Sequence, residues 1–387
     1  MIKKYFFLLI LAFTSKLMFG QVDTALVTLT PSSQTVYSLT NPVSIQVGVE
    51  GVVGLFAISV TLSFNNSIVK CQNIIQGNFL INNPGSYSTF FETFPEDLSS
   101  SDSITVDQSI LGYSSVSGSG EIFEVTFIPF APGRTVVDVI SLSLRDINNM
   151  EIPAKAGSAE INVSLSVVNA KIFLEGPFSS GTMSTVLNSS GYLPLVQPYS
   201  SAPWYYSGYE SVAANFFSTY QDIVDWVLIQ LRTGISSGTT IATRAAFLKN
   251  DGTIVDLNGV SPVAFFVPTN VEYHIVIKHR NHLSIMSSVS IPLSVSTPLY
   301  NFTTGQNKAY GTNSMNDLGG GVYGLFTGDI DGSGVVNAAD RSQVWNQRNL
   351  LGYYGTDVGT DVDLSGTVDA GDRSTIWNNR NLNTQVP

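Results

Sequence analysis

The chain ends in two copies of one acidic, tryptophan-bearing segment. The first copy, DIDGSGVVNAADRSQVWNQRNL, starts at Asp329, and the second, DVDLSGTVDAGDRSTIWNNRNL, starts at Asp361. Fourteen of the 22 positions are identical, far more than two unrelated segments of this length would share. The duplication therefore predicts one structural unit that is used twice.

Each copy carries oxygen-bearing side chains at positions 1, 3, 5, 9 and 12 and glycine at position 6. This is the spacing of an EF-hand loop, in which the backbone carbonyl of position 7 adds a further ligand. A Ca²⁺ ion takes about six to eight oxygen ligands, and a tight loop can supply most of them. We therefore predict two calcium ions. The predicted ligands are Asp329, Asp331, Ser333, Val335, Asn337 and Asp340 in the first loop, and Asp361, Asp363, Ser365, Thr367, Asp369 and Asp372 in the second.

Two departures from a two-helix EF-hand are informative. Position 12 is Asp instead of Glu, and Gly328 and Thr360 stand where an entering helix would end. In both respects the segment resembles a dockerin domain, which the resemblance places at residues 328–384 as a small α-helical domain of two loop–helix motifs. Because the acidic loops repel themselves without metal, calcium is expected to fold this domain as well as to bind it.

A helical stretch follows each loop. Val336 and Val368 are expected to pair between the loops, and Val344 and Ile376 to face a small core. The dockerin resemblance implies that loop positions 10 and 11 and the exposed side of each helix contact a cohesin. These positions are Ala338, Ala339, Ser342, Trp345 and Asn346, then Ala370, Gly371, Ser374, Trp377 and Asn378. A tryptophan in so small a domain could also be a core residue. Arg348 and Arg380 stand where many dockerins carry an apolar core residue.

The N-terminus predicts export. Two lysines in MIKK precede the short apolar run YFFLLILAF, so residues 1–20 are expected to be a signal peptide and the protein to be secreted, extracellular or associated with the cell surface. No later stretch reaches the roughly 18 apolar residues of a spanning helix. Cys71 is the single cysteine, which excludes an intramolecular disulfide and favours a small buried hydrophobe over a reactive thiol.

Residues 22–166 alternate in the manner of short antiparallel strands. In LFAISVTLSF the apolar side chains from Phe56 to Phe64 recur at every second position, which predicts a β-sandwich. The run from VSIQVGVEG to QGNFL, followed by GEIFEVTFIPFAPGRTVVDVISLSLRD, resembles a cohesin domain. A generic immunoglobulin-like or carbohydrate-binding sandwich remains the alternative, because it shares the same alternation.

Residues 167–318 predict a second antiparallel β-sandwich, and the Gly-rich residues 319–327 a linker. Segments such as LEGP, DWVLIQLR and HRNHL resemble an uncharacterised module found before terminal dockerins. This resemblance indicates which domain follows the module and implies no chemical activity for it. The fold class is therefore mostly β, with two consecutive sandwiches before the small helical domain.

The middle module holds three groups that could carry chemistry. His274, His279 and His282 invite a metal site, but period-two geometry separates the first from the second and favours structural histidines. Trp204, Tyr205 and Tyr206 are candidates for stacking on a sugar. A glycoside hydrolase would need two carboxylates, and none of the available ones has a recognisable signature. These carboxylates are Glu175, Glu210, Asp222, Asp225, Asp251, Asp256 and Glu272.

Together these features predict a secreted, non-catalytic assembly protein in polysaccharide catabolism, whose partners are cohesin-bearing or dockerin-bearing secreted proteins and, as a further candidate, polysaccharide. The net charge of −11 argues against nucleic acid as a ligand. Two alternatives stay open: a glycoside hydrolase delivered by the dockerin, and a carbohydrate-binding adhesin.

Overall fold

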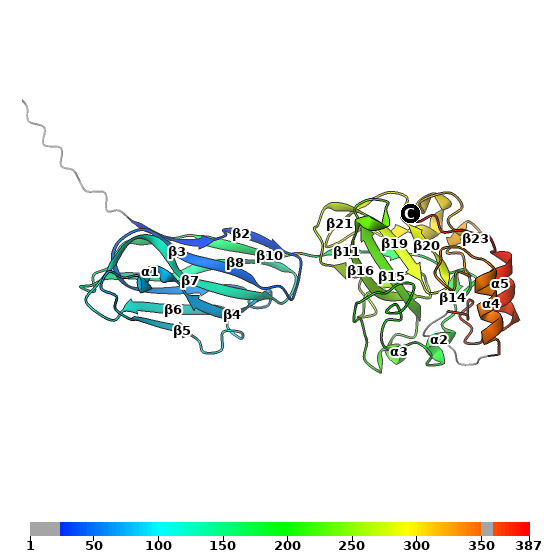
Figure 1. The fold of residues 1–387 in the computed structure, drawn as a ribbon, viewed down its shortest axis with the longest axis horizontal. Helices are drawn as coiled ribbons and strands as arrows, with labels where there is room; N and C mark the ends of the chain where they lie inside the picture. The colour runs from blue at the N-terminus through cyan, green and yellow to red at the C-terminus, as the bar shows by residue number, and fades with distance from the viewer. Residues whose placement is uncertain (1–23, 350–358) are drawn as a thin grey trace, which may run out of the picture. The chain divides into compact units, whose positions relative to one another are not determined.

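The computed structural model describes residues 24–349 and 359–387. It is mostly β, and it divides between Val163 and Ser164 into two compact units (Figure 1). The predicted signal peptide lies outside the described residues. Within them, no helix has both the length and the apolar character that a membrane crossing requires.

The described part of unit 1, residues 24–163, contains ten strands and one short helix. They are β1 (Ala25–Thr30), β2 (Ser33–Val36), β3 (Val43–Ser63), β4 (Val69–Gln76), α1 (Asn78–Ile81), β5 (Thr89–Phe94), β6 (Ser103–Ile110), β7 (Val116–Pro129), β8 (Gly133–Asp146), β9 (Ala154–Ala156) and β10 (Ser158–Val163).

The long strand β3 organises unit 1. Most of the alternating run from Phe56 to Phe64 lies in the second half of this strand, which has 21 residues. Its first half pairs with β1 and β7, and its second half pairs with β6 and β8. Two groups of strands therefore share β3, namely β4-β7-β3-β1-β9 and β5-β6-β3-β8-β10-β2. The register shifts between Val49 and Leu55 mark the passage from one group to the other.

One apolar core fills the space between the two groups of strands. It takes the inward side chains of β3 from Val43 to Leu62, and those of β7 such as Phe123 and Phe127. This is the architecture of a β-sandwich, as the alternation predicts. Two pairs, β1–β9 and β2–β10, are parallel, a departure from the purely antiparallel expectation. Cys71 is 1% exposed within this core, and burial raises its pKa to about 12, which confirms the buried hydrophobe.

Unit 2 holds the remaining elements. Its strands are β11 (Ser166–Val168), β12 (Ala170–Lys171), β13 (Phe178–Ser179), β14 (Thr182–Met183), β15 (Ile223–Arg232), β16 (Thr240–Lys249), β17 (Ile254–Val255), β18 (Val263–Phe265), β19 (Val271–His279), β20 (His282–Met286), β21 (Ile291–Leu293), β22 (Tyr300–Asn301), β23 (Asn316–Gly319) and β24 (Val322–Gly324). Its helices are α2 (Val186–Ser189), α3 (Phe216–Thr219), α4 (Ala338–Gln347) and α5 (Ala370–Asn378), with 3₁₀ turns at Ser237–Thr239, Phe302–Thr304 and Gln306–Lys308.

The middle module differs from the predicted second sandwich. Its regular strands form one six-stranded antiparallel sheet in the order β17-β16-β15-β19-β20, with β21 also on β19, and the other strands form two-stranded pairs. Short helices and irregular segments supply the rest of the packing, because Leu187 of α2, Phe216 of α3, Leu193 and Tyr199 join the same core as the sheet. The central strand β15 is buried on both faces, which explains why apolar residues stand at successive positions from Trp226 to Ile229.

The terminal repeat belongs to the same compact unit as the middle module. The expected linker 319–327 instead continues a hairpin of β23 and β24, after which Leu325 pairs with Leu174 and Thr327 with His282. Glycines set the turn of this hairpin, and buried apolar residues follow it, so the Gly-rich composition marks a turn and not a flexible spacer. The helices α4 and α5 lie side by side (orange and red in Figure 1).

Candidate functional site

Each acidic loop gathers three carboxylates at one point. In the first loop, one oxygen each of Asp329, Asp331 and Asp340 lie within 4.8 Å of one another. In the second loop, Asp361, Asp363 and Asp372 do the same. These residues stand at loop positions 1, 3 and 12, so the structure brings together three of the predicted ligands in each copy.

Hydrogen bonds from the loop backbone hold the position-12 carboxylates in place. Asp340 accepts from the amides of Ile330 at 2.8 Å and Asn337 at 2.9 Å, and Asp372 accepts from the corresponding amides of Val362 and Asp369, both at 2.8 Å. Each loop therefore closes on the first turn of its own outgoing helix.

The turn at position 6 completes the loop. Gly334 and Gly366 both adopt φ of +81°, a left-handed conformation that favours glycine. Their amides donate to the position-1 carboxylates, Gly334 to Asp329 at 3.1 Å and Gly366 to Asp361 at 2.7 Å.

Burial disfavours the negative charge of these carboxylates, and at Asp361 the nearby Arg280 guanidinium offsets part of this effect on the pKa. Burial, followed by the nearby charge of Asp340, raises the pKa of Asp329 to about 7. Burial also raises the pKa of Asp361 to about 7, and that of Asp372 to about 6. A raised carboxyl pKa means that the negative form is disfavoured where it stands. A bound cation is the group that would reverse this cost.

The donor set fits a hard cation. Three carboxylates in each loop would hold calcium, whose positive charge would offset their mutual repulsion. The other predicted ligands have additional bonds in the structure. The Ser333 and Ser365 hydroxyls donate to the carbonyls of Val335 and Thr367, each at 3.3 Å.

The residue at position 9 also caps the following helix, which the loop spacing alone did not predict. Asn337 accepts from the amide of Ala339 at the start of α4, and Asp369 accepts from the amide of Gly371 at the start of α5. Each residue is the N-cap of its helix and completes a capping box with the Asp at position 12. The acidic pattern therefore encodes helix initiation together with the loop.

A small apolar core joins the two copies. Val336, Val344, Val368 and Ile376 are all buried in it, together with Leu283 from β20 of the middle module. The expected inward positions are thus buried.

The link between the copies is symmetric in the backbone. The amide of Asn349 donates to the carbonyl of Val368, and the amide of Asn381 donates to the carbonyl of Val336, both at 2.8 Å. Asn349 and Asn381 occupy the same position in the two copies, and so do Val336 and Val368. The two hydrogen bonds are therefore equivalent.

The outer face of the helices carries two half-exposed indoles. Trp345 is 49% exposed and Trp377 is 47% exposed, so neither is a core residue. All ten residues that the dockerin resemblance assigns to a partner are exposed. They lie on the surface of the loop exits and helices, where a partner could reach them.

Four arginines surround the indoles. Arg348 stacks on Trp345 at 4.3 Å from the ring centroid, and Arg380 stacks on Trp377 at 4.4 Å. Both arginines therefore lie on the surface and not in the small core. Two further arginines cross between the helices, Arg373 to Trp345 at 4.7 Å and Arg341 to Trp377 at 4.5 Å. The sequence analysis missed this crossing, although the identical position of Arg341 and Arg373 in the two copies was a usable signal.

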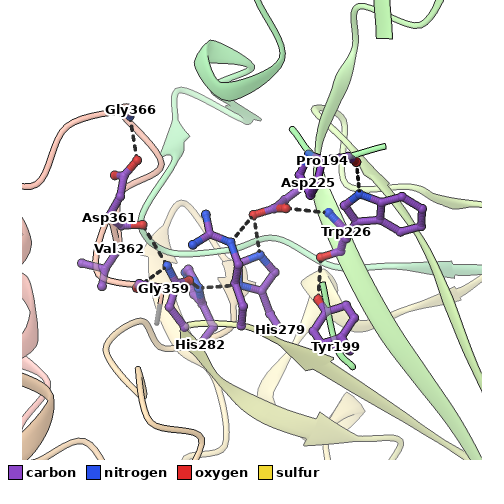
Figure 2. A network of polar contacts seen from close by, with 12 residues as sticks. Pro194, Tyr199, Asp225, Trp226, His279, His282, Gly359, Asp361, Val362 and Gly366 are labelled. Carbon is purple, nitrogen blue, oxygen red and sulfur yellow. Dashed lines mark hydrogen bonds and ion pairs between the residues drawn. The ribbon is translucent and has the colours of Figure 1, made fainter. Parts of the chain in front are cut away.

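Asn281 ties the second loop to the middle module. Its side-chain amide donates to the carbonyls of Gly359 at 3.0 Å and Asp361 at 2.8 Å (Figure 2). Its side-chain oxygen contacts Nδ1 of His282 at 2.7 Å. Because Asn281 is fully buried, these contacts are shielded from water, and a residue of the middle module therefore positions a predicted metal ligand.

A second tie runs through Glu175. Its Oε2 accepts from the amide of Thr327 at 2.9 Å and from the side chain of Asn379 at 2.6 Å. Asn379 also donates to the carbonyl of Thr327. Glu175 is therefore a structural residue at the joint between the middle module and the repeat.

The histidines behave as structural residues. His279 and His282 face one another across the β19–β20 turn, with their Nδ1 atoms 3.1 Å apart. His279 also contacts the fully buried Asp225 at 3.2 Å, and Arg280 pairs with the same carboxylate at 2.9 Å (Figure 2). Burial lowers the pKa of both histidines, which favours neutral rings that take part in a hydrogen-bonded network.

The other candidate carboxylates also have structural contacts. Asp222 pairs with Lys249 and Asp256 with Arg244, both at 2.6 Å. Asp251 accepts from Thr253 within a turn, and Glu272 accepts from Ser290. Each contact gives the residue a role in the fold.

The three aromatic residues predicted to stack on a sugar differ in exposure. Tyr205 is 76% exposed, whereas Trp204 and Tyr206 are partly buried and pack against the core of the middle module. The Tyr206 hydroxyl donates to Glu210 at 2.5 Å, and Trp204 meets Tyr199 edge to face with centroids 5.3 Å apart. The three rings therefore have different environments.

No family model matches the chain. No curated protein matches it. Solved structures similar to part of it are cohesin modules. A non-cellulosomal cohesin from the archaeon Archaeoglobus fulgidus is 16% identical, with 36% of this chain and 91% of that chain covered and a TM-score of 0.30. The second type II cohesin of the ScaA scaffoldin of Acetivibrio cellulolyticus is 11% identical, with 36% and 90% covered and a TM-score of 0.31. A type I cohesin–dockerin complex from Clostridium thermocellum is 10% identical, with 36% and 93% covered and a TM-score of 0.30.

Proposed function

We propose that the chain is a secreted, non-catalytic assembly protein whose terminal repeat is a dockerin that binds two calcium ions and docks onto a cohesin-bearing partner. The doubled site carries this proposal. Each loop gathers three carboxylates within 4.8 Å and leads directly into a helix with an exposed indole. Loop closure and the docking face are therefore parts of one element.

The chemistry of the docking face supports recognition of an acidic partner. Apart from the loop residues Asp340 and Asp372, neither helix contains an acidic side chain, while four arginines stack on the two indoles. Tryptophan and arginine are the residues most enriched at the energetic centres of interfaces. Calcium would neutralise the loops beneath this face and leave it positively charged.

Unit 1 supplies the second half of the proposed role. Its β-sandwich and the strand pattern that resembles a cohesin support a receptor for dockerin-bearing proteins. A chain with both parts would accept one partner and be accepted by another. Such a linker would bring components of a polysaccharide-degrading assembly together outside the cell.

Binding of the full chain to immobilised cohesin domains, with calcium or with a chelator, tests the proposal. We expect two calcium sites by calorimetry and binding that disappears with the chelator. Because hot-spot tryptophans each contribute about 2 kcal/mol or more, Trp345→Ala combined with Trp377→Ala should weaken binding by roughly a thousandfold.

Tyr209→Ala is the matched control, since this aromatic ring is 93% exposed on the middle module and lies outside the proposed face. It should bind as the unchanged protein does. Binding that survives both the chelator and the double tryptophan substitution would refute the dockerin assignment.

A further inference from the structure

The two acidic loops differ at position 4, where the first loop has Gly332 and the second has Leu364. Both residues adopt a left-handed backbone, with φ of +64° and +57°. This conformation suits glycine and is uncommon for a branched residue such as leucine. Because such a residue persists only where its surroundings fix it, we expect strong contacts around the Leu364 side chain.

The side chain of Leu364 lies in the core of the middle module. It is fully buried and belongs to the same apolar cluster as Trp226 and Ile229 of the central strand β15. Among the described residues of the repeat, 328–349 and 359–384, it is the only member of this cluster. Leu283 of the middle module lies in turn in the small core of the repeat. Each part thus contributes one leucine to the core of the other.

The backbone of the second loop also lies against the middle module on both sides of Leu364. A Cβ at Gly176 would overlap the carbonyl oxygen of Val362, and a Cβ at Gly366 would lie 2.9 Å from Cε2 of Tyr192. The Thr327 hydroxyl donates to the same carbonyl of Val362 at 3.1 Å. The loop positions before and after Leu364 are therefore held as closely as the side chain itself.

The first loop contacts the middle module without a buried side chain at this position. A Cβ at Gly332 would overlap Pro203, which is itself exposed. The first loop therefore lies on the surface of the middle module, whereas the second loop reaches its core through Leu364.

Leu364 stands between two predicted calcium ligands, Asp363 and Ser365. The amide of Ser365 donates to the carboxylates of Asp361 at 3.0 Å and Asp363 at 3.1 Å. Because these residues are consecutive in the chain, a movement of Leu364 out of the core would displace the ligands on both sides. Opening of the loop would likewise withdraw Leu364 from the core.

We infer that Leu364 couples calcium binding in the second loop to the stability of the middle module. The inference rests on the proposed calcium sites. A ligand that binds only the closed loop stabilises every contact that closure requires, and such coupling is reciprocal. Calcium in the second loop therefore stabilises the central sheet, and a folded middle module raises the calcium affinity of that loop. The complete docking face then forms only on a chain whose middle module is folded.

Hydrogen exchange of the full chain, measured by mass spectrometry with calcium and with a chelator, tests the coupling. Free calcium at about 100 times its Kd slows the opening of a fully coupled segment about 100-fold. We expect this slowing in β15, which lies in the middle module and contains no predicted ligand. Slowing in α4 and α5 without any change in β15 would overturn the inference and leave the proposed function standing. No slowing in any of these three elements would overturn both.

Leu364→Gly copies the first loop at this position and removes the buried side chain. It should reduce the calcium-dependent slowing of exchange in β15 at least about tenfold, while the slowing in α4 behind the first loop persists. Leu364→Met keeps a long apolar side chain and should retain the slowing. Leu364→Ala, which keeps only the Cβ, is the second variant if the glycine variant fails to fold. An unchanged slowing in either folded truncation would overturn the inference.

Leu293→Ala is the matched control for a cavity in the same core. Leu293 is a fully buried residue of β21, and β21 lies away from α4 and α5 (Figure 1). This variant should speed exchange in β15 equally with calcium and with the chelator, so that the ratio of the two rates stays as in the unchanged chain. If Leu293→Ala lowers this ratio as much as Leu364→Gly does, Leu364 has only a packing role and the inference is refuted.

Discussion

Replacing Asn281 by alanine should weaken calcium binding at the second loop and leave the first loop unaffected. The substitution removes the side-chain bonds to the carbonyls of Gly359 and Asp361 and the contact with His282. It keeps the backbone carbonyl of residue 281, which accepts from the amide of Gly328 at 2.8 Å beside the first loop. The two loops should therefore respond differently.

The magnitude follows from the groups left without partners. Each buried polar group that loses its hydrogen bond costs about 1–3 kcal/mol. Two orphaned carbonyls predict a loss of about 2–6 kcal/mol, a large part of the roughly 5–15 kcal/mol that stabilises an ordinary domain. If about half of this loss falls on loop closure, affinity at the second loop drops by about 5-fold to 150-fold.

Calcium titration by calorimetry resolves the two sites, and thermal unfolding in the presence of a chelator gives the stability of the metal-free unit. Asn258→Ala is the matched control, because Asn258 is an exposed turn residue of the same module that bonds only to its own turn. Equal calcium affinities at both sites in Asn281→Ala, or an equal loss at both, would refute the coupling described above.

Three further predictions concern charge. Because the pKa of Asp329 and of Asp361 is raised to about 7, the metal-free unit should lose stability as the pH rises from about 4 to 7, while calcium affinity increases over the same interval. Unfolding with a chelator at several pH values checks this, and a flat profile would contradict it. Asp363→Asn removes one of three gathered carboxylates and should weaken one calcium site of two in calorimetry, whereas two unchanged sites would exclude it as a ligand. Cys71, with its pKa raised to about 12, should react with thiol reagents only after unfolding, and rapid labelling of the native protein would show that its burial is incomplete.

The sequence was most informative where one local rule decides the structure. The spacing of the acidic residues correctly placed Asp329, Asp331 and Asp340 together, because a loop of this length brings its own ends into contact. Alternation likewise predicted the sandwich of unit 1, since each buried position of β3 follows a period of two or a short interruption.

Contacts between distant segments could not be predicted in this way. Asn281 meets Asp361 across 80 positions of the chain, and no periodicity marks that meeting. The linker prediction at 319–327 used glycine content alone, which cannot distinguish a hairpin turn from a spacer. The prediction of a second sandwich was also wrong. Short helices and irregular segments pack against the sheet of the middle module, where a second sheet was expected.

The joint formed by Glu175 and Asn281 has a mechanical consequence. A partner bound to α4 and α5 would pull on the repeat, and with a flexible linker the first response would be extension at almost no cost. The load instead passes at once into short hydrogen bonds, buried at Asn281 and partly buried at Glu175. The connection between the terminal repeat and the middle module therefore behaves as a stiff coupling, and the distance from a bound partner to the central sheet stays fixed under tension.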